Sequence, residues 1–471
     1  MKNYTICDLD DCLIKTDLLY EQWLVLLKTK PLIFMQSLFW LIGGIAHFKT
    51  QMAKHTAIHA QFLPYREQVI KYLKTAKTEG KSELILASAS PRPWVESVAN
   101  HIGIFDHVIG SIEGHNFKGL AKLQAIQAQI GNAEFSYIAD HSVDLKIWNH
   151  ASKVIAVNPS DALKAKIKDL NKPTEYIEDP KIRTWKLAIK QIRPHQWIKN
   201  SLVFLPAIAG HKLNSANAFV ECIFAFAGFS LAASFVYVLN DLLDLKADRN
   251  HHTKKNRPFA SGNLPIKWGL ILLPSLLAGC AIFAFMLPVE YSGWILTYLL
   301  LNIAYSLYLK QSVVVDIIIL SMMYTLRIFA GAAATVVPVS EWLLSFSTLF
   351  FFSLACVKRY TEIIRSKNKL TIDGRGYRQV DHPTVQALGV GSGLISILII
   401  LLYLQSKEVR ALYQNPQHLW FATPVLLFWI SRIWILTNRD EIHDDPVVFA
   451  VKDRVSWICF AAIGLIIGFS T

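Results

Sequence analysis

From about residue 200 to the C-terminus the chain is a series of long apolar runs, and this pattern limits its fold most strongly. Many of these runs are close to the roughly 20 residues that a helix needs to cross a bilayer. Before about residue 190, charged and apolar stretches alternate as they do in soluble domains, and 471 residues exceed one ordinary domain. We therefore expect a soluble α/β domain followed by an all-α polytopic membrane domain.

The charge of the loops predicts the membrane topology. Lys and Arg concentrate in short cytoplasmic loops, and they are frequent in residues 181–199 and 246–267. If both segments face the cytoplasm, the short run 201–213 must cross the membrane as well as 218–239. The result is nine spans with the C-terminus outside. The predicted spans are residues 201–213, 218–239, 269–288, 291–309, 313–336, 342–357, 385–405, 417–437 and 455–470.

The formal net charge of +13 does not indicate a nucleic-acid partner, because much of it lies in loops between apolar runs. Membrane topology and anionic ligands explain this distribution better. The six cysteines include no CxxC pair, which argues against a disulfide framework and a zinc site. No signal peptide opens the chain, so we expect a multi-pass protein of the inner membrane with a cytoplasmic N-terminal domain.

The stretch from Asn240 to Asp248 carries the strongest chemical signal. On one helix, positions i, i+3 and i+7 share a face, so Asp241, Asp244 and Asp248 project together where a span ends. Converging carboxylates repel one another unless a cation joins them, and such oxygen ligands suit Mg²⁺ that also binds phosphates. An acidic helix end in a solvated loop is the alternative. The basic residues that follow offer donors for phosphate oxygens: Lys254, Lys255 and Arg257.

These residues resemble the UbiA prenyltransferase superfamily, whose first aspartate motif, NDxxDxxxD, matches residues 240–248. The run RPHQWIKN at 193–200 looks like the start of its first membrane helix. That run, YVLND at 237–241, YSLYLK at 305–310 and DDPV at 444–447 resemble the decaprenyl-phosphate phosphoribosyltransferase branch more narrowly. The resemblance covers about residues 190–471 and implies a UbiA-like fold with Mg²⁺ as cofactor.

The chain departs from the superfamily at the second aspartate motif, where a DxxxD pair is usual. Asp316 is present, but Leu320 stands one turn later, so Asp316 alone would contribute to a second Mg²⁺ site. Arg327 follows on the same face, either as a functional charge inside the bilayer or as a packing partner of Asp316. Lys358 and Arg359 end the sixth span, where they could bind a phosphate or mark the cytoplasmic boundary.

The resemblance implies a pyrophosphate-containing donor and a polyprenyl lipid substrate. In the branch interpretation the donor is phosphoribosyl pyrophosphate and the acceptor is a polyprenyl phosphate. A prenyltransferase that moves a polyprenyl group from its diphosphate to an aromatic acceptor is one alternative, and a transporter or lipid-binding scaffold is another. Asp444 and Asp445 could close the site or cap the last helix. The expected substrate-binding residues are Lys199, Asn240, Lys254, Lys255, Arg257, Asp316, Arg327, Lys358 and Arg359.

The N-terminal segment begins with an apolar strand that ends in the DxD of Asp8 and Asp10. With Ser88 and Asp140 after later strands, the order of motifs resembles the haloacid dehalogenase-like (HAD-like) superfamily over about residues 1–165. The resemblance implies that Asp8 is the nucleophile and Asp10 the general acid/base. It implies further roles for Ser88 and Lys122 at the phosphoryl group. The implied Mg²⁺ ligands are Asp8, Asp10, Asp140 and Asp144.

Two features qualify this N-terminal interpretation. Cys12 occupies a position that is usually Thr, so a HAD-like fold kept as a docking module is the alternative to a phosphatase. The apolar stretch 31–46 is too short for a comfortable span, and we expect a cap that lies on the bilayer surface or an ordinary buried helix. We interpret 1–165 as the phosphatase domain, 166–190 as linker with an interfacial helix, and 191–471 as the transferase domain. The leading hypothesis is a bifunctional enzyme.

Overall fold

The computed structural model describes residues 3–79, 82–180, 182–365, 375–443 and 445–470. The chain divides into two compact units. The first unit comprises Met1–Ile192 and Tyr237–Leu273, and the second comprises Arg193–Val236 and Pro274–Thr471. The segment that carries the aspartate motif therefore belongs to the same unit as the N-terminal domain, whereas the sequence predicted a boundary at residue 191.

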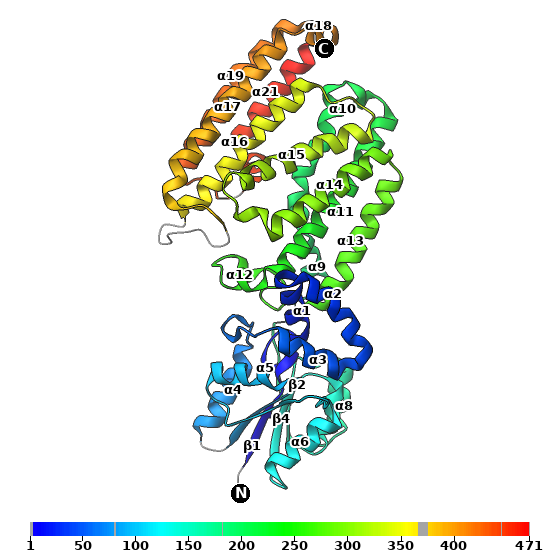
Figure 1. Ribbon diagram of the computed structural model, residues 1–471, viewed down its shortest axis with the longest axis vertical. Helices are drawn as coiled ribbons and strands as arrows, with labels where there is room; N and C mark the ends of the chain where they lie inside the picture. Colours follow the sequence, from blue (N-terminus) through cyan, green and yellow to red (C-terminus); the bar gives the residue numbers. More distant parts are fainter. Residues whose placement is uncertain (1–2, 80–81, 181, 366–374, 444, 471) are drawn as a thin grey trace. The chain divides into compact units, whose positions relative to one another are not determined.

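A six-stranded parallel sheet forms the centre of the first unit (Figure 1). The order of its strands is β3-β2-β1-β4-β5-β6. Helical crossovers between parallel strands explain the strand–helix alternation of the sequence. The strands are β1 (Tyr4–Cys7), β2 (Glu83–Pro91), β3 (His107–Ser111), β4 (Phe135–Ala139), β5 (Lys153–Val157) and β6 (Thr174–Ile177).

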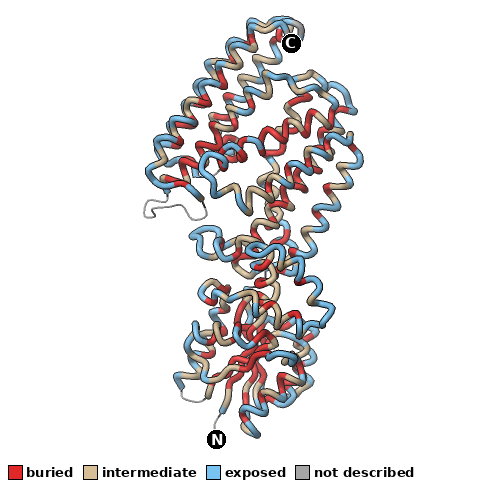
Figure 2. Tube along the Cα trace, viewed as in Figure 1, coloured by how far each residue is buried: buried red, intermediate tan, exposed pale blue. Residues whose placement is uncertain are grey.

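Helices cover both faces of this sheet, with α4 and α5 on one side and α6 and α8 on the other (Figure 1). Alternate strand residues point to opposite faces, so Ile6 belongs to the core under α6 and α8 while Cys7 belongs to the core under α4 and α5. The central strands β1, β2, β4 and β5 are accordingly the most continuously buried part of this unit (Figure 2). The helices of the unit are α1 (Leu18–Thr29), α2 (Pro31–Trp40), α3 (Gly44–His55), α4 (Glu67–Thr78), α5 (Arg92–Ile102), α6 (Leu120–Ile130), α7 (Leu145–Trp148), α8 (Asp161–Lys168), α9 (Thr184–Ile192) and α12 (Leu245–Arg249).

The predicted linker, residues 166–190, is wrong in its first part. The short strand β6 lies there and pairs in parallel with β5, so the sheet continues to Ile177. A strand of four residues with Thr, Glu and Tyr has no clear apolar alternation, which is why the sequence pattern did not indicate it. The predicted helix before the membrane domain is present as α9.

Seven stretches among the described residues are long and apolar enough to cross a membrane. Six coincide with predicted spans: α11, α13, α15, α16, the stretch around α17 and the stretch around α19. The seventh is Pro31–His55 in the N-terminal domain. The helices of the second unit, and those it shares with the first, are α10 (Leu205–Ala209), α11 (Ala216–Leu243), α13 (Lys267–Phe285), α14 (Val289–Leu307), α15 (Val315–Ala334), α16 (Glu341–Arg365), α17 (His382–Leu404), α18 (Lys407–Leu412), α19 (Ala422–Asn438), α20 (Pro446–Lys452) and α21 (Arg454–Ser470).

The count of nine spans is therefore approximate. Residues 201–213 do not form one membrane-length helix: a 3₁₀ segment, Pro194–Phe204, leads into the five-residue helix α10. α14 has 19 residues but is not among the seven stretches, and the apolar helix α21 has only 17. Among the seven stretches, α15 is the most buried, and it carries both predicted intramembrane charges.

Candidate functional site

The predicted catalytic residues of the N-terminal domain meet at the carboxyl edge of its sheet. β1 pairs with β2 on one side and with β4 on the other, so residues at the ends of these strands become neighbours. Asp8 directly follows β1, Asp140 directly follows β4, and Ser88 lies within β2. This edge of a parallel α/β sheet is where binding sites form.

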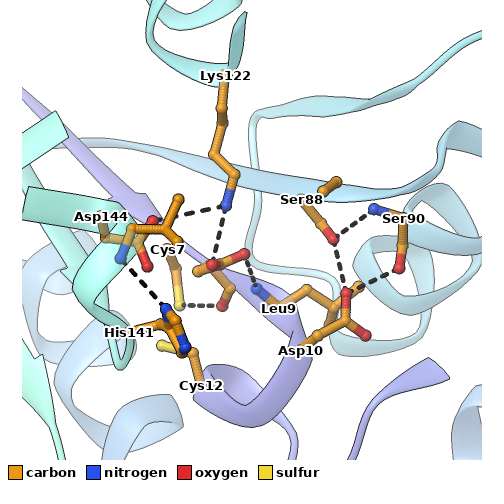
Figure 3. A network of polar contacts seen from close by, with 12 residues as sticks. Cys7, Leu9, Asp10, Cys12, Ser88, Ser90, Lys122, His141 and Asp144 are labelled. Carbon is orange, nitrogen blue, oxygen red and sulfur yellow. Dashed lines mark hydrogen bonds and ion pairs between the residues drawn. The ribbon is translucent and has the colours of Figure 1, made fainter. Parts of the chain in front are cut away.

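Three carboxylates gather into one cluster at this edge. Oxygen atoms of Asp8, Asp140 and Asp144 lie within 4.8 Å of one another, and no other His, Cys, Asp or Glu trio in the described ranges does so. The Lys122 ammonium lies 2.8 Å from Asp8 and 3.9 Å from Asp144 (Figure 3). Lys122 also donates a hydrogen bond of 3.2 Å to the Tyr137 hydroxyl. One lysine against three carboxylates leaves a negative excess, so the donor set fits a divalent cation such as Mg²⁺.

Burial and mutual repulsion raise the pKa of two of these carboxylates, those of Asp8 and Asp140. Burial raises the pKa of Asp8 to about 6; Lys122 opposes this shift and Asp144 adds to it. Burial, followed by the charge of Asp8, holds the pKa of Asp140 well above its usual range. Burial alone would lower the pKa of Lys122, but Asp8 and Asp144 outweigh it and raise that pKa. The lysine therefore stays charged, and a bound cation would oppose the protonation of Asp8 and Asp140.

Asp10 lies apart from this acidic cluster. Its carboxylate accepts hydrogen bonds from the Ser88 hydroxyl at 2.9 Å, the Ser90 hydroxyl at 2.7 Å and the Leu18 backbone N–H at 2.9 Å (Figure 3). These bonds fix the side chain, as a general acid/base requires. Ser90 was not predicted, although the Ser-x-Ser repeat at the end of β2 was an available signal. The role of Asp10 as a metal ligand stays a prediction.

A cavity of about 360 Å³ lies between α3 and the core of the N-terminal domain. The Lys49 ammonium on its α3 side donates a 2.7 Å hydrogen bond to the carbonyl oxygen of Ala89, between the two serines that hold Asp10. Lys54 and Arg92 also line the cavity, and they are paired with two acids of the same lining, Glu113 at 2.9 Å and Glu96 at 2.7 Å. The cavity is large enough to take a phosphorylated group. Sequence reasoning did not single out Lys49, because one lysine in an apolar cap gives no pattern.

Cys12, which stands where the HAD-like superfamily usually has Thr, is fully buried in the core. Its thiol donates to the carbonyl oxygen of Ile138 at 3.6 Å, and burial raises its pKa well above the usual range. It is therefore a neutral packing residue behind the acidic cluster, and its presence leaves the predicted catalytic groups in place.

The aspartate motif begins at the end of α11, and its helix is interrupted at Asp244. This residue has non-helical dihedral angles (φ −104°, ψ 17°) and precedes α12. Backbone hydrogen bonds nevertheless run from Asp244 to Asn240 and from Asp248 to Asp244, at 2.9 and 2.8 Å. The helical spacing on which the prediction rests is thus kept, with a change of direction in the middle.

Asp241 and Asp248 converge on one cation. The Nη1 atom of Arg257 lies 2.9 Å from Asp241 and 2.6 Å from Asp248, and each aspartate is only 3% exposed. The second oxygen of Asp241 accepts a hydrogen bond of 2.7 Å from the amide of Gln191, a partner that sequence reasoning missed. Two buried carboxylates that share one positive group fit a site for Mg²⁺. Asp244 does not complete a cluster of three carboxylates with them. Its carboxylate lies 2.5 Å from the Lys28 ammonium instead.

Helix α1 of the N-terminal domain holds the loop that contains this motif. Glu21 forms a two-pronged ion pair with Arg249 at 2.6 and 3.0 Å, and both side chains are about 8% exposed. Lys28 lies 2.5 Å from Asp244. The loop also approaches closely at Gly262 (φ +72°), where an added Cβ would clash with Lys15 of the N-terminal domain. These contacts place the two predicted chemistries in one folded unit.

In the second unit, α15 carries Asp316, which is completely buried. Its carboxylate is 2.6 Å from Nε of Arg359 and 2.9 Å from Nη1 of Arg375, and it accepts a hydrogen bond of 2.7 Å from the Tyr305 hydroxyl. Protein charges neutralise Asp316, so the predicted contribution to a second Mg²⁺ site finds no support here. Arg359 likewise contacts acidic groups, those of Asp316 and Glu362, rather than an open surface that could take a phosphate.

We expect Arg359→Met to lower the free energy of unfolding by roughly 3 kcal/mol, because it leaves a buried carboxylate with incomplete compensation. Thermal unfolding of the purified protein in detergent would measure this. The double variant Asp316→Asn/Arg359→Met should recover part of the loss. Arg365→Met, on the same helix but at a half-exposed ion pair with Asp440, is the matched control and should change little. Equal stability of the two arginine variants would contradict the expectation.

Lys199 and Lys358 converge on Asp445. The Asp445 carboxylate lies 2.8 Å from Lys199 and 3.5 Å from Lys358, and it accepts hydrogen bonds of 2.9 and 3.0 Å from Tyr324. Burial would raise the pKa of Asp445, but the two lysines outweigh it and hold that pKa below its usual range. Asp445 also caps the short helix α20 through its side chain. It does not cap the last helix, as one of the two predictions had it, because that helix, α21, begins only at Arg454. Asp444 lies outside the described residues.

Arg327 does not pair with Asp316, whose carboxylate is held by other arginines. Its Nε donates a 2.9 Å hydrogen bond to the amide oxygen of Asn200, and its Nη1 donates to the backbone oxygen of Met323. The packing alternative of the sequence analysis is therefore wrong in its partner. The guanidinium lies over three aromatic rings, those of Phe229 at 4.9 Å, Tyr298 at 5.2 Å and Tyr324 at 5.6 Å. This aromatic surround stabilises a buried cation.

The remaining predicted phosphate ligands lie in or beside the aspartate loop. Lys254 and Lys255 lie on an exposed 3₁₀ turn, and Asn240 is half-buried near the end of α11. Their substrate contacts stay predictions.

Comparison with known proteins identifies both parts of the chain. Residues 202–454 match the UbiA prenyltransferase family, and residues 5–148 match the haloacid dehalogenase-like hydrolases. The first match covers more than half of the chain. The chain belongs to the UbiA prenyltransferase family. Its N-terminal domain is HAD-like. The protein is therefore a multi-pass membrane transferase of the UbiA family that also carries a phosphatase-type domain.

Three relatives of this UbiA-family protein differ in how much of the chain they match. The uncharacterized protein y4nM of Sinorhizobium fredii is 35% identical over 461 residues, 97% of this chain and 89% of that protein, so it shares both domains. Nodulation protein NoeC of Azorhizobium caulinodans is 34% identical over 279 residues, 58% of this chain and 89% of its own. Decaprenyl-phosphate phosphoribosyltransferase of Mycobacterium tuberculosis is 32% identical over 302 residues, 60% of this chain and 94% of its own.

Proposed function

We propose that the UbiA domain transfers a phosphoribosyl group from phosphoribosyl pyrophosphate to a polyprenyl phosphate in the inner membrane. The HAD-like domain, on the cytoplasmic side, then removes the terminal phosphate from the lipid-linked product. The observation that carries the proposal is the 32% identity to a decaprenyl-phosphate phosphoribosyltransferase over 94% of that protein's length.

The aspartate motif is the proposed site for the donor pyrophosphate. Asp241 and Asp248 already share one cation, Arg257, which supports their ability to hold Mg²⁺ together. When bound, Mg²⁺ would neutralise the charge that develops on the leaving pyrophosphate. Arg257 would then turn to the phosphate oxygens, and Lys254 and Lys255 would add donors from the same loop. Gln191 orients Asp241 by donating to its second oxygen.

Lys199 and Lys358 are the proposed ligands of the acceptor phosphate. The two ammonium groups already share one anion, the carboxylate of Asp445, at 2.8 and 3.5 Å. A lipid phosphate is also an anion, and in place of Asp445 it would accept hydrogen bonds from the same two ammonium groups. The neutralisation of Asp316 by two arginines argues for one metal-binding motif rather than two, which fits a phosphoribosyl donor better than a prenyl diphosphate held by two acidic motifs.

In the HAD-like domain, Asp8 is the proposed nucleophile toward phosphorus. Lys122, 2.8 Å from Asp8, keeps this carboxylate available as the anion and compensates charge on the phosphoryl group. Asp10, which accepts hydrogen bonds from Ser88 and Ser90, is the proposed general acid that protonates the leaving alcohol and the proposed base that then activates water. The partner lipid is the product of the membrane reaction, so both sites would act on one molecule in turn.

Full-length protein in lipid nanodiscs should test this reaction directly. With Mg²⁺, ribose-labelled phosphoribosyl pyrophosphate and polyprenyl phosphate, we expect labelled lipid and release of inorganic phosphate. Chelation of Mg²⁺ should abolish both. Turnover of a polyprenyl diphosphate with an aromatic acceptor, without any ribose-labelled lipid, would rule out the proposal and favour the aromatic prenyltransferase.

A further inference from the structure

The α2–α3 hairpin of the HAD-like domain carries an exposed apolar surface, which we name the cap ridge. Its seven large apolar side chains lie between residues 32 and 45 and are 42–85% exposed. Figure 2 draws most of this stretch as exposed. Soluble domains rarely leave so many neighbouring apolar groups in water unless something covers them. The cap ridge consists of Leu32, Met35, Leu38, Phe39, Leu41, Ile42 and Ile45.

The exposure of the cap ridge does not result from poor packing of the hairpin. The inner face of α2 packs on α1, where the Trp23 indole donates a 3.0 Å hydrogen bond to the buried Ser37 and lies 5.0 Å from the Phe34 ring. α3 inserts Phe48 and Met52 into the core of the domain. The hairpin is therefore complete on its inner side, and the ridge is a second, outward apolar face.

The hairpin does not span a membrane as one helix, although Pro31–His55 is long and apolar enough. Gly44 has φ +86°, which breaks the helix between α2 and α3. Phe48 and Met52 tie α3 to the domain core. The ten residues of α2 alone reach only about 15 Å, half of the roughly 30 Å of hydrocarbon in a bilayer. An apolar ridge of this length fits the surface layer of a membrane instead.

The hairpin lies beside the end of a candidate membrane span, and this position favours lipid as the partner that covers the cap ridge. Lys28, three residues before Pro31, lies 2.5 Å from Asp244, and Asp244 directly follows the candidate span α11. α2 thus begins next to the point where a candidate span ends, which is where lipid headgroups would lie. The surrounding sequence also suits anionic lipid, because residues 22–66 contain no Asp or Glu. Of the four lysines in this stretch, Lys28 and Lys54 are paired with Asp244 and Glu113, whereas Lys30 and Lys49 donate to backbone carbonyl oxygens and keep their positive charge without a carboxylate in those contacts.

We infer that the cap ridge is embedded in the interfacial layer of an anionic phospholipid bilayer and holds the HAD-like site at the membrane surface. The Lys49 side of α3 lines the 360 Å³ cavity, so the same hairpin touches both the bilayer and the place where a headgroup would enter. This inference concerns membrane contact and does not depend on which reaction the UbiA domain catalyses.

A fluorescent probe on the ridge tests this inference in the full-length protein. The six native cysteines are buried, so an environment-sensitive thiol reagent should label Ile42→Cys selectively. The protein is reconstituted in nanodiscs of phosphatidylcholine and phosphatidylglycerol that carry nitroxide lipids. Leu120→Cys, at a 53% exposed position on α6, is the matched control. We expect headgroup-level nitroxides to quench the ridge label at least about threefold more than the control.

Three outcomes would overturn the inference. Equal quenching at both positions would mean that the ridge lies in water. Stronger quenching by nitroxides at the bilayer centre would mean that the stretch crosses the membrane. Fluorophore self-quenching that disappears when labelled protein is diluted with unlabelled protein would mean that a second copy covers the ridge. Met35→Cys, a 58% exposed position on α2, is the second probe if the Ile42 variant does not fold.

Discussion

Replacing Asp241 with asparagine is expected to lower formation of the lipid-linked product at least about 100-fold, because the donor site loses a charged metal ligand. The amide is nearly isosteric, and it can still accept a hydrogen bond from Gln191 or Arg257, so the fold should persist. Asp248 would remain as a buried acid beside Arg257, and Mg²⁺ would bind weakly. The initial rate of ribose-labelled lipid formation, measured across a series of Mg²⁺ concentrations, checks this expectation.

The Mg²⁺ series separates a metal ligand from a structural residue. If Asp241 binds the cation, the variant should need more Mg²⁺ to reach half of its remaining rate. If Asp241 only holds Arg257 and Gln191 in place, the rate should fall without a change in Mg²⁺ requirement, and the assignment would be wrong. Glu290→Gln, at an exposed acid in the first turn of α14, is the matched control and should behave as wild type.

The order of motifs along the chain was enough to predict which residues gather at the sheet edge of the HAD-like domain. Parallel strands present their carboxyl ends at one edge, so apolar runs that end in Asp8, Ser88 and Asp140 predict that these residues meet. The structure confirms that arrangement through the pairing of β1 with β2 and β4. Local helical spacing similarly predicted the convergence of Asp241 and Asp248, since residues seven apart share a face.

The partners of the predicted charges could not be predicted, because they come from distant parts of the chain. Arg257 and Gln191 bind Asp241, and Arg375 binds Asp316 across an interval of 59 residues. No local period links such pairs; they form when tertiary packing brings buried charges together and each must be compensated. For the same reason, the sequence pattern did not predict the ion pair between Glu21 and Arg249, which joins the HAD-like domain to the aspartate loop.

Hydropathy was a partial guide to the membrane helices. The charge of the neighbouring loops predicted a span at residues 201–213, which include Pro206. The structure instead has a 3₁₀ segment there that leads into a five-residue helix. The positive-inside rule indicates which side of the membrane a loop faces, but it does not predict the secondary structure of the segment that crosses. The stretch Pro31–His55 is the converse case, because its length and composition suit a span. The sequence predicted a cap or a buried helix there instead, and the stretch is interrupted at Gly44 and packs on the N-terminal core.

Replacing Asp8 with asparagine is expected to reduce phosphate release from the lipid-linked product at least about 1000-fold, because the nucleophile is lost. The UbiA reaction should continue, since the aspartate loop and the second unit are unchanged. The phosphorylated lipid should therefore accumulate, whereas Asp241→Asn should yield neither the phosphorylated nor the dephosphorylated lipid. Mass spectrometry of lipid extracts from nanodisc reactions distinguishes the two species.

The comparison of the two variants tests the order of the reactions as well as the two sites. Glu134→Gln, at an exposed acid just before β4, is the control and should process the lipid to completion. Accumulation of the phosphorylated lipid in the Asp8 variant alone would mean that the HAD-like site acts second, on a product made in the same membrane. Full dephosphorylation by the Asp8 variant would remove the phosphatase assignment. The HAD-like fold would then serve to hold the aspartate loop through Glu21 and Lys28, a role that its ion pairs with Arg249 and Asp244 could fill without any chemistry.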